Sequence, residues 1–177
     1  MTATFINSFI LFFVTIDTIG NLPFFLSLTE GAKIKKRNQI ALKSIIIAFF
    51  IMITFAYVGR YLLEAIGVSL DSLKIAGGVI LMVLAIDILF EKRKRRREKR
   101  VEEVLDEKSF EDIVVFPIAI PFIAGPSALT TIILLIGNYK NFPEYQVPVI
   151  FALVVALIVG LILMTVSYTH LTLPTKA

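Results

Sequence analysis

Residues 5–28, FINSFILFFVTIDTIGNLPFFLSL, carry the pattern that decides the fold. This stretch is apolar enough, and long enough, to cross the roughly 30 Å of hydrocarbon in a bilayer as a helix. A carboxylate, Asp17, nevertheless lies near its middle, and the helix-breaking residues Gly20 and Pro23 follow closely. The stretch therefore predicts a membrane span that is interrupted near its centre.

Further apolar runs predict an all-α fold, a polytopic transmembrane helical bundle with five spans. Of the 177 residues, 57% are hydrophobic and only 18% are charged, which is unlike the composition of a soluble domain. We expect one transmembrane domain over residues 1–166. Its spans are predicted at about 5–28, 40–58, 73–90, 113–136 and 148–166, with a basic loop at about 91–112.

The distribution of Lys and Arg predicts the orientation of the chain in the membrane. The regions around the first and third loops hold 14 of the 18 basic residues, and such loops face the cytoplasm. We therefore expect the N-terminus to lie outside the cell. The run Lys92–Arg100 is interpreted as an anchor of this kind, with binding of anionic lipid headgroups as an open alternative. Nucleic acid is not an expected partner.

The C-terminal segment 167–177, SYTHLTLPTKA, has no membrane pattern and no relation to the preceding sequence. We interpret it as a non-native tail that replaces the true C-terminus. The chain contains no cysteine, and its one histidine, His170, lies in this tail. No metal site or cofactor is predicted. An enzyme is not expected either, because no nucleophile and base are paired within the spans.

Asp17 is the first candidate for a functional side chain. A carboxylate at the centre of a span costs on the order of 3 kcal/mol, and such residues usually face a cavity or the interior of a bundle. Around Asp17 lie Thr18, Gly20 and Asn21, which predict an unwound point that contacts an ion, a proton or a substrate. The alternative is a structural role, as a helix cap or a buried hydrogen-bonding group.

The fourth span contains a second set of breakers. Pro117, Pro121 and Gly125 recur every four residues, which predicts that they share one helix face. Gly125-Pro126 resembles a new helix start with proline at its first position, followed by Ser127 and Thr130. The free N–H groups of such a start attract anions. The alternative is a proline kink that only shapes packing.

Interruptions in the first and fourth spans have the parity of an inverted three-plus-three repeat, whose interface commonly holds the substrate site of a transporter. The corresponding breaker positions favour this arrangement, although the two halves have little sequence identity. The repeat would require a sixth span, which the sequence lacks. This is a second reason to expect that the last span is missing.

Three segments resemble signatures of the MarC family of integral membrane proteins. They are residues 17–29 (DTIGNLPFFLSLT), 75–81 (IAGGVIL) and 117–126 (PIAIPFIAGP). The resemblance implies a prokaryotic inner-membrane protein with six spans, some of whose relatives are classed as transporters of neutral amino acids such as glycine or alanine. The sequence departs from the family pattern in two respects. Thr18 stands where the family usually has proline, and the sixth span is absent.

These observations favour a secondary transporter of a small zwitterionic solute, most simply a neutral amino acid, with H⁺ or Na⁺ as alternative coupling ions. Asp17 and Asn21 would bind the ammonium group or the coupling ion, and the helix start at Gly125-Pro126 would bind the carboxylate. A membrane scaffold or regulatory protein that transports nothing is the alternative function. A homo-oligomer is left open.

Overall fold

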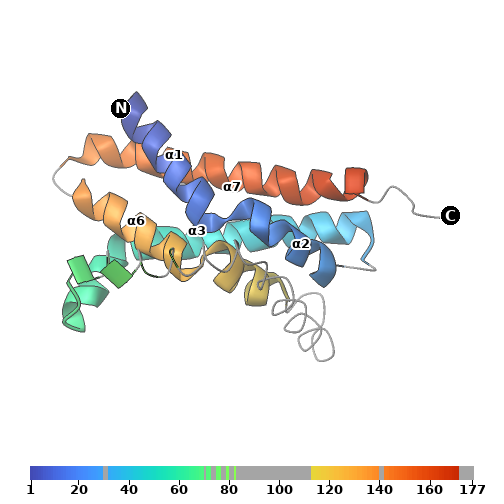
Figure 1. Cartoon of the computed structure of the whole chain (residues 1–177), viewed down its shortest axis with the longest axis horizontal. Coiled ribbons are helices and arrows are strands. Elements are labelled where there is room, and N and C mark those ends of the chain that lie inside the picture. The colour runs from blue at the N-terminus through green and yellow to red at the C-terminus, as the bar shows by residue number, and fades with distance from the viewer. Residues whose placement is uncertain are drawn as a thin grey trace.

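The computed structural model describes residues 1–29, 32–69, 71–72, 75–76, 79, 82, 113–139 and 142–171, with side chains as far as residue 166. All regular elements in these ranges are helices, which confirms the predicted all-α class (Figure 1). The predicted span at 73–90 falls largely outside the described residues. The loop at 91–112, including Lys92–Arg100, falls outside them entirely.

The first predicted span consists of two helices, α1 (Thr2–Ile16) and α2 (Thr18–Leu28). Together they form an apolar stretch of 27 residues, long enough to cross a bilayer. The fourth span is also divided, into η1 (Val114–Ile123) and α6 (Pro126–Asn138), whose axes differ by 59°. Both predicted interruptions are therefore present.

Two long helices complete the described bundle, and both extend beyond their predicted spans. α3 covers Ile34–Ala65 rather than 40–58, and α7 covers Pro143–Leu171 rather than 148–166. A helix of 32 residues is about 48 Å long, more than the hydrocarbon requires, because polar residues continue it beyond the lipid. The backbone of α7 also enters the segment 167–177, whose non-native origin stays a prediction.

The two broken spans lie side by side and run in opposite directions. α1 contacts α6, and α2 contacts η1, so the first half of each broken span lies beside the second half of the other (Figure 1). Opposite directions are what an inverted repeat requires of its first and fourth spans. α3 and α7 pack against each other. α7 also contacts both broken spans, whereas α3 packs against the two halves of the fourth span.

Small side chains let α3 approach its neighbours closely. A stripe of residues with helical spacing faces the interior. Gly59 lies at its end, and a Cβ atom added there would lie 2.7 Å from the side chain of Ile133 on α6. Close approach through small residues is the usual way in which helices associate in lipid. The buried stripe on α3 comprises Ala41, Ser44, Ala48, Met52, Ala56 and Gly59.

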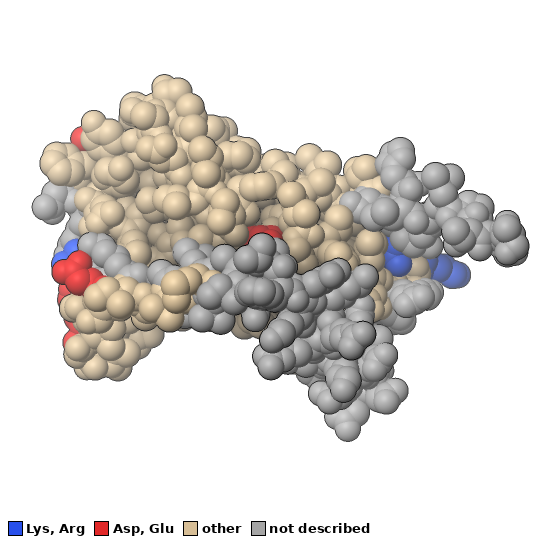
Figure 2. Space-filling view, in the orientation of Figure 1, with Lys and Arg blue, Asp and Glu red and all other residues tan. Residues whose placement is uncertain are grey.

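The outer surface is that of a protein embedded in lipid. Large apolar side chains on the outside of α3, among them Ile46, Phe50 and Val58, are exposed. Figure 2 shows an uncharged surface over most of the visible described part, with the basic side chains near its two ends. An exposed apolar belt bounded by charged ends matches the environment of a bilayer.

Ser44 provides a test of how α3 holds η1. Its hydroxyl donates a buried hydrogen bond of 2.9 Å to the carbonyl oxygen of Val114. We predict that Ser44→Ala lowers the free energy of unfolding by about 0.6 kcal/mol, the average for hydrogen bonds between membrane helices, and by at most about 1.7 kcal/mol. Thr54→Val is the control, because the exposed Thr54 hydroxyl bonds only Phe50 of its own helix. Equal losses of thermal stability in detergent for the two variants would contradict the prediction.

Candidate functional site

The break in the first span is confined to Asp17. Its backbone is left-handed (φ 50°, ψ 50°), a conformation that aspartate tolerates better than most residues. The Asp17 carboxylate then accepts a 3.2 Å hydrogen bond from the N–H of Gly20 and caps the start of α2. The predicted unwinding from Asp17 to Pro23 is wrong in extent, because Gly20 and Pro23 both lie inside α2. A single left-handed residue is enough to separate the helices.

The break in the fourth span has a different cause. Phe116 and Ile120 have extended backbones, with ψ of 120° and 125°, because each precedes a proline whose ring disfavours the helical conformation. The prediction that Pro117, Pro121 and Gly125 share one helix face is therefore wrong. Pro117 is buried, whereas Pro121 is exposed.

Gly125 closes this second break. It is the N-cap of α6, which begins at Pro126 as predicted, and no side chain caps it. A Cβ atom at Gly125 would lie 2.6 Å from the carbonyl oxygen of Pro121. Because that obstacle is backbone, only glycine fits between the end of η1 and the start of α6.

The two breaks are joined by reciprocal hydrogen bonds. The buried amide of Asn21, on α2, donates to the carbonyl oxygens of Ile16 and Phe122, both at 2.7 Å. The hydroxyl of Ser127, on α6, donates to the carbonyl oxygen of Thr15 at 3.0 Å. A side chain of α2 thus bonds a carbonyl oxygen at the end of η1, and a side chain of α6 bonds one at the end of α1. These carbonyls lose their helical partners where the helices end, so the side chains replace missing backbone donors.

Thr18 and Thr130 occupy different surroundings. Thr18 is buried beside α7, where a Cβ atom at Gly160 would lie 3.3 Å from its methyl group. Thr130 donates a 2.8 Å hydrogen bond to the carbonyl oxygen of Pro126 in its own helix. The structure therefore brings Thr18 to the junction of the breaks, but the Thr130 hydroxyl adds no link between the spans.

The junction combines a carboxylate with the starts of two half-helices. Asp17 is partly exposed, and Figure 2 shows acidic atoms at the surface midway along the molecule, where α1 meets α2. The positive ends of the α2 and α6 dipoles favour negative charge nearby. Among the described residues, no group of His, Cys, Asp and Glu is arranged to hold a metal ion.

The sequence did not reveal several residues that build this site. Thr15 was expected as a polar side chain beside Asp17, but it contributes its backbone oxygen, as Phe122 does, and a backbone oxygen leaves no side-chain signal. Arg37 is one of the basic residues around the first predicted loop, yet it is buried in the first turn of α3, at the end of α2 away from the junction. Its guanidinium donates a 2.8 Å hydrogen bond to the carbonyl oxygen of Thr29 at the end of α2, where a cation is favourable. Its position in a short connection, eight residues after Thr29, was the available signal.

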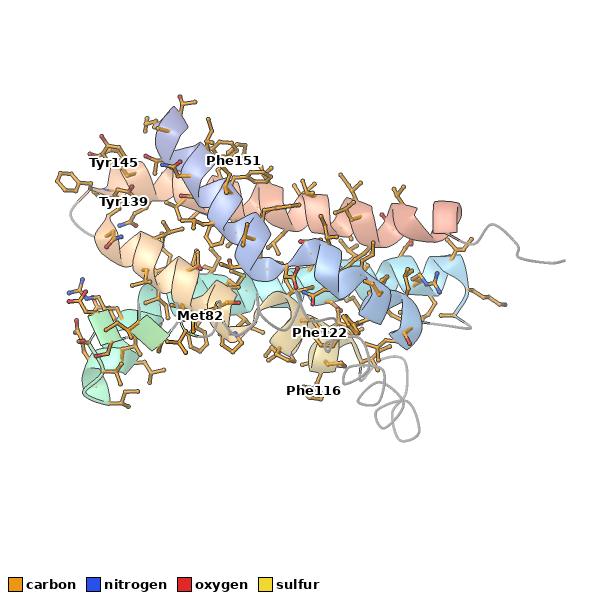
Figure 3. The ribbon with its side chains drawn as sticks, in the orientation of Figure 1. Met82, Phe116, Phe122, Tyr139, Tyr145 and Phe151 are labelled. Carbon is orange, nitrogen blue, oxygen red and sulfur yellow. The ribbon has the colours of Figure 1, made fainter. Side chains whose placement is uncertain are left out.

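Aromatic contacts support the arrangement on either side of the junction. Phe24 on α2 packs against Phe122 on η1, with ring centroids 5.8 Å apart. Phe5 on α1 packs against Phe151 on α7 at 5.5 Å (Figure 3). Pairs of this kind contribute beyond the area that they bury. The contact between Phe24 and Phe122 holds α2 and η1 together beside the hydrogen bond from Asn21.

Comparison with known proteins places this architecture in a family. The profile described as "MarC family integral membrane protein" matches residues 2–173. A "UPF0056 membrane protein" of Archaeoglobus fulgidus is 38% identical over 94% of this chain and 74% of its own length. For "UPF0056 membrane protein YvbG" of Bacillus subtilis, the identity is 32% over 89% of this chain and 75% of the relative. "UPF0056 inner membrane protein YhgN" of Escherichia coli is 29% identical over 77% and 66%. No solved structure matches the chain significantly.

Replacing Asn21 tests the link between the breaks. Asn21→Leu keeps a similar volume but removes both donated hydrogen bonds, which leaves two buried carbonyl oxygens without this donor. We predict a loss of about 1–3 kcal/mol in the free energy of unfolding. Thr130→Val is the matched control, since its hydroxyl bonds only its own helix. Unfolding in detergent should separate the two variants, and a comparable loss in both would count against a structural link.

The two glycines at the breaks are expected to differ in their tolerance of alanine. At Gly20, an added Cβ atom would lie 2.5 Å from the Asp17 carboxylate. The carboxylate can rotate away, which removes the helix cap and lowers the free energy of unfolding by about 1 kcal/mol. At Gly125 the obstacle is backbone, so Gly125→Ala should cost about 3 kcal/mol or more. Folded yield and thermal stability of both variants measure the difference. The reverse order of stability would contradict the described geometry.

Proposed function

The chain belongs to the MarC family of integral membrane proteins, and from its paired broken spans we propose that it is a secondary transporter of a small solute. The solute is a small zwitterion, most simply a neutral amino acid. The observation that carries the proposal is the pair of hydrogen bonds, from Asn21 to Phe122 and from Ser127 to Thr15, that joins two interrupted and antiparallel spans. Interrupted helices at the interface of inverted repeats are the usual position of a transporter's binding site.

The charges at the junction suit a zwitterion. Asp17 supplies a partly exposed carboxylate for an ammonium group. The start of α6 at Pro126 has no side-chain cap, so its N–H groups and dipole suit a carboxylate. Asn21 would act mainly by holding the two breaks together, because its amide already donates to two carbonyl oxygens. This assigns Asn21 a positioning role in place of direct solute binding.

The same carboxylate is our candidate for ion coupling. Asp17 lies midway along the first span, whereas Glu64 and Glu144 lie at the ends of α3 and α7. A carboxylate inside the membrane can take up H⁺ or attract Na⁺, and such residues are typical of transport pathways. We propose that the protein acts in the cell membrane, with its N-terminus outside, and that it is not an enzyme.

A membrane scaffold or regulatory protein remains the second candidate. It is favoured by the structural use of the polar groups at the junction, where Asp17 caps α2 and Asn21 and Ser127 bond backbone oxygens. In this alternative the breaks serve packing alone. The two functions differ in what the Asp17 charge does, so a substitution that keeps the cap but removes the charge separates them.

Asp17→Asn is that substitution, because asparagine also caps helices and tolerates a left-handed backbone. We predict that purified protein in proteoliposomes takes up radiolabelled glycine or alanine, and that Asp17→Asn reduces uptake to the level of empty liposomes without lowering thermal stability. Glu64→Gln is the control. It removes a carboxylate from an exposed pair with Arg60, far along α3 from the junction.

The outcomes decide between the two candidates. Loss of uptake in Asp17→Asn, with normal uptake in Glu64→Gln, supports a carboxylate that takes part in transport. Normal uptake in both variants would remove Asp17 from the mechanism. Absence of uptake by the unmodified protein, across neutral amino acids and under gradients of H⁺ and Na⁺, would favour the scaffold.

A further inference from the structure

One polar atom at the junction has no hydrogen-bond partner among the described residues. The hydroxyl oxygen of Thr18 is fully buried, and the residue as a whole is only 2% exposed. Thr18 is the first residue of α2, so its hydroxyl cannot bond a carbonyl one turn earlier in that helix, as Thr15 and Thr130 do in theirs. A buried hydroxyl without a partner is unfavourable, which makes this atom the strongest indication of a missing ligand.

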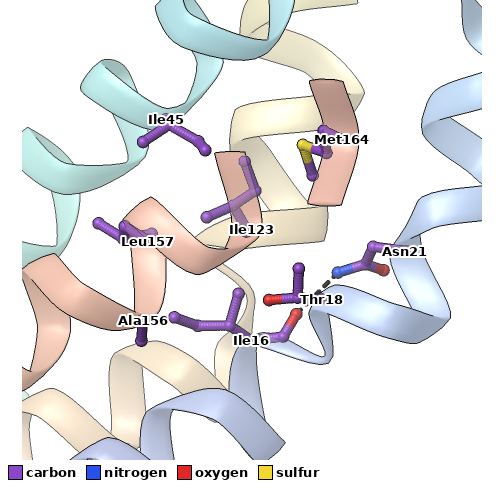
Figure 4. Close-up of a pocket in the computed structure, with 9 residues that line it drawn as sticks. Ile16, Thr18, Asn21, Ile45, Ile123, Ala156, Leu157 and Met164 are labelled. Carbon is purple, nitrogen blue, oxygen red and sulfur yellow. Dashed lines mark hydrogen bonds between the residues drawn. The ribbon is translucent and has the colours of Figure 1, made fainter. Parts of the chain in front are cut away.

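A small cavity lies beside this hydroxyl. Its volume is about 10 Å³, and its walls come from α1, α2, α3, η1 and α7. Figure 4 shows the Thr18 hydroxyl pointing into this space rather than toward Asn21, whose amide is bonded to Ile16. Gly160 on α7 leaves room at the cavity because it has no side chain.

We propose that this cavity binds a single internal water molecule, held between the Thr18 hydroxyl and the carbonyl oxygen of Ile16. A cavity of about 10 Å³ is near the lower limit of the volume that one water molecule needs. The Ile16 oxygen accepts from Asn21 and, as a carbonyl, has a second lone pair. Two polar partners suffice for a buried water, and the remaining walls are mostly aliphatic.

A metal cation fits this cavity less well. Oxygen-ligated cations such as Ca²⁺ and Mg²⁺ take six or more oxygens, whereas the polar residues of the cavity wall, Thr18 and Asn21, together with the carbonyl group of Ile16, offer three. Water would also complete a consistent pattern. Asn21 on α2 and Ser127 on α6 donate to carbonyl oxygens at the broken end of α1, and the water would satisfy the remaining hydroxyl beside α7. This inference does not depend on transport.

A double-mutant cycle tests the water directly. Gly160→Ala places a methyl group 3.3–3.5 Å from the Thr18 side chain and would displace the water, which leaves the hydroxyl unsatisfied. Thr18→Val removes the hydroxyl but keeps the shape, so the same methyl group meets similar steric contacts. We expect Gly160→Ala to lower the Tm of the full chain in detergent by about 2–4 °C or more. In the Thr18→Val background, the same change should have a clearly smaller effect.

Each other outcome of the cycle is also decisive. Equal shifts in Tm in both backgrounds would mean that only the methyl group matters and would overturn the proposal. If Gly160→Ala fails to fold, recovery of folding by Thr18→Val supports the water, and failure of the double variant counts against it. A rise in Tm for Thr18→Val alone would show that the hydroxyl is unsatisfied and the cavity dry.

Salt identity separates water from a cation. The Tm of the unmodified protein should be equal in NaCl and in choline chloride at the same concentration. A stabilisation specific to Na⁺ that disappears in Thr18→Val would assign the cavity to Na⁺ and overturn the water. Uptake measurements enter none of these tests, so failure of the transport proposal and failure of this one remain distinguishable.

Discussion

The structure depends on one constraint, that a backbone inside hydrocarbon must satisfy its own N–H and C=O groups. Each break in a span frees carbonyl oxygens that lipid cannot satisfy. Here the freed oxygens of Thr15, Ile16 and Phe122 accept hydrogen bonds from two side chains, Asn21 and Ser127. Because two of these bonds run between spans, neither break is complete alone. The antiparallel pairing of α1 with α6 and of α2 with η1 follows from that mutual requirement.

Much of this fold follows from sequence patterns, because hydropathy and helix-breaking residues act locally. The apolar runs predicted the helices, the first span was expected to break near Asp17, and Gly125-Pro126 was expected to begin a helix. Local rules also explain the errors. The shared face of Pro117 and Pro121 assumed a regular helix, whereas the residue before each proline is extended. The prediction of unwinding as far as Pro23 assumed that every helix-breaking residue interrupts the helix, whereas Pro23 lies inside α2.

The parts that sequence reasoning missed are the long-range ones. Asn21 and Phe122 are 101 positions apart, and the acceptor is a backbone oxygen that any residue would provide. No pattern in one sequence reports such a contact. Arg37 shows the same limit in another form. Its charge placed it in a loop, yet it is buried because the carbonyl oxygen of Thr29 accepts a bond from its guanidinium. Charge predicts exposure only when no partner lies within reach of the side chain.

The reciprocal bonds also bear on how such a protein could move. If α2 rotated about Asp17 alone, the hydrogen bond from Asn21 to Phe122 would break and leave a freed oxygen in a low-dielectric interior. A rotation of α6 alone would do the same to the bond from Ser127 to Thr15. Movements that keep both bonds must carry α2 with η1 and α6 with α1. The bonds that stabilise the breaks therefore couple half-helices of different spans in any such motion.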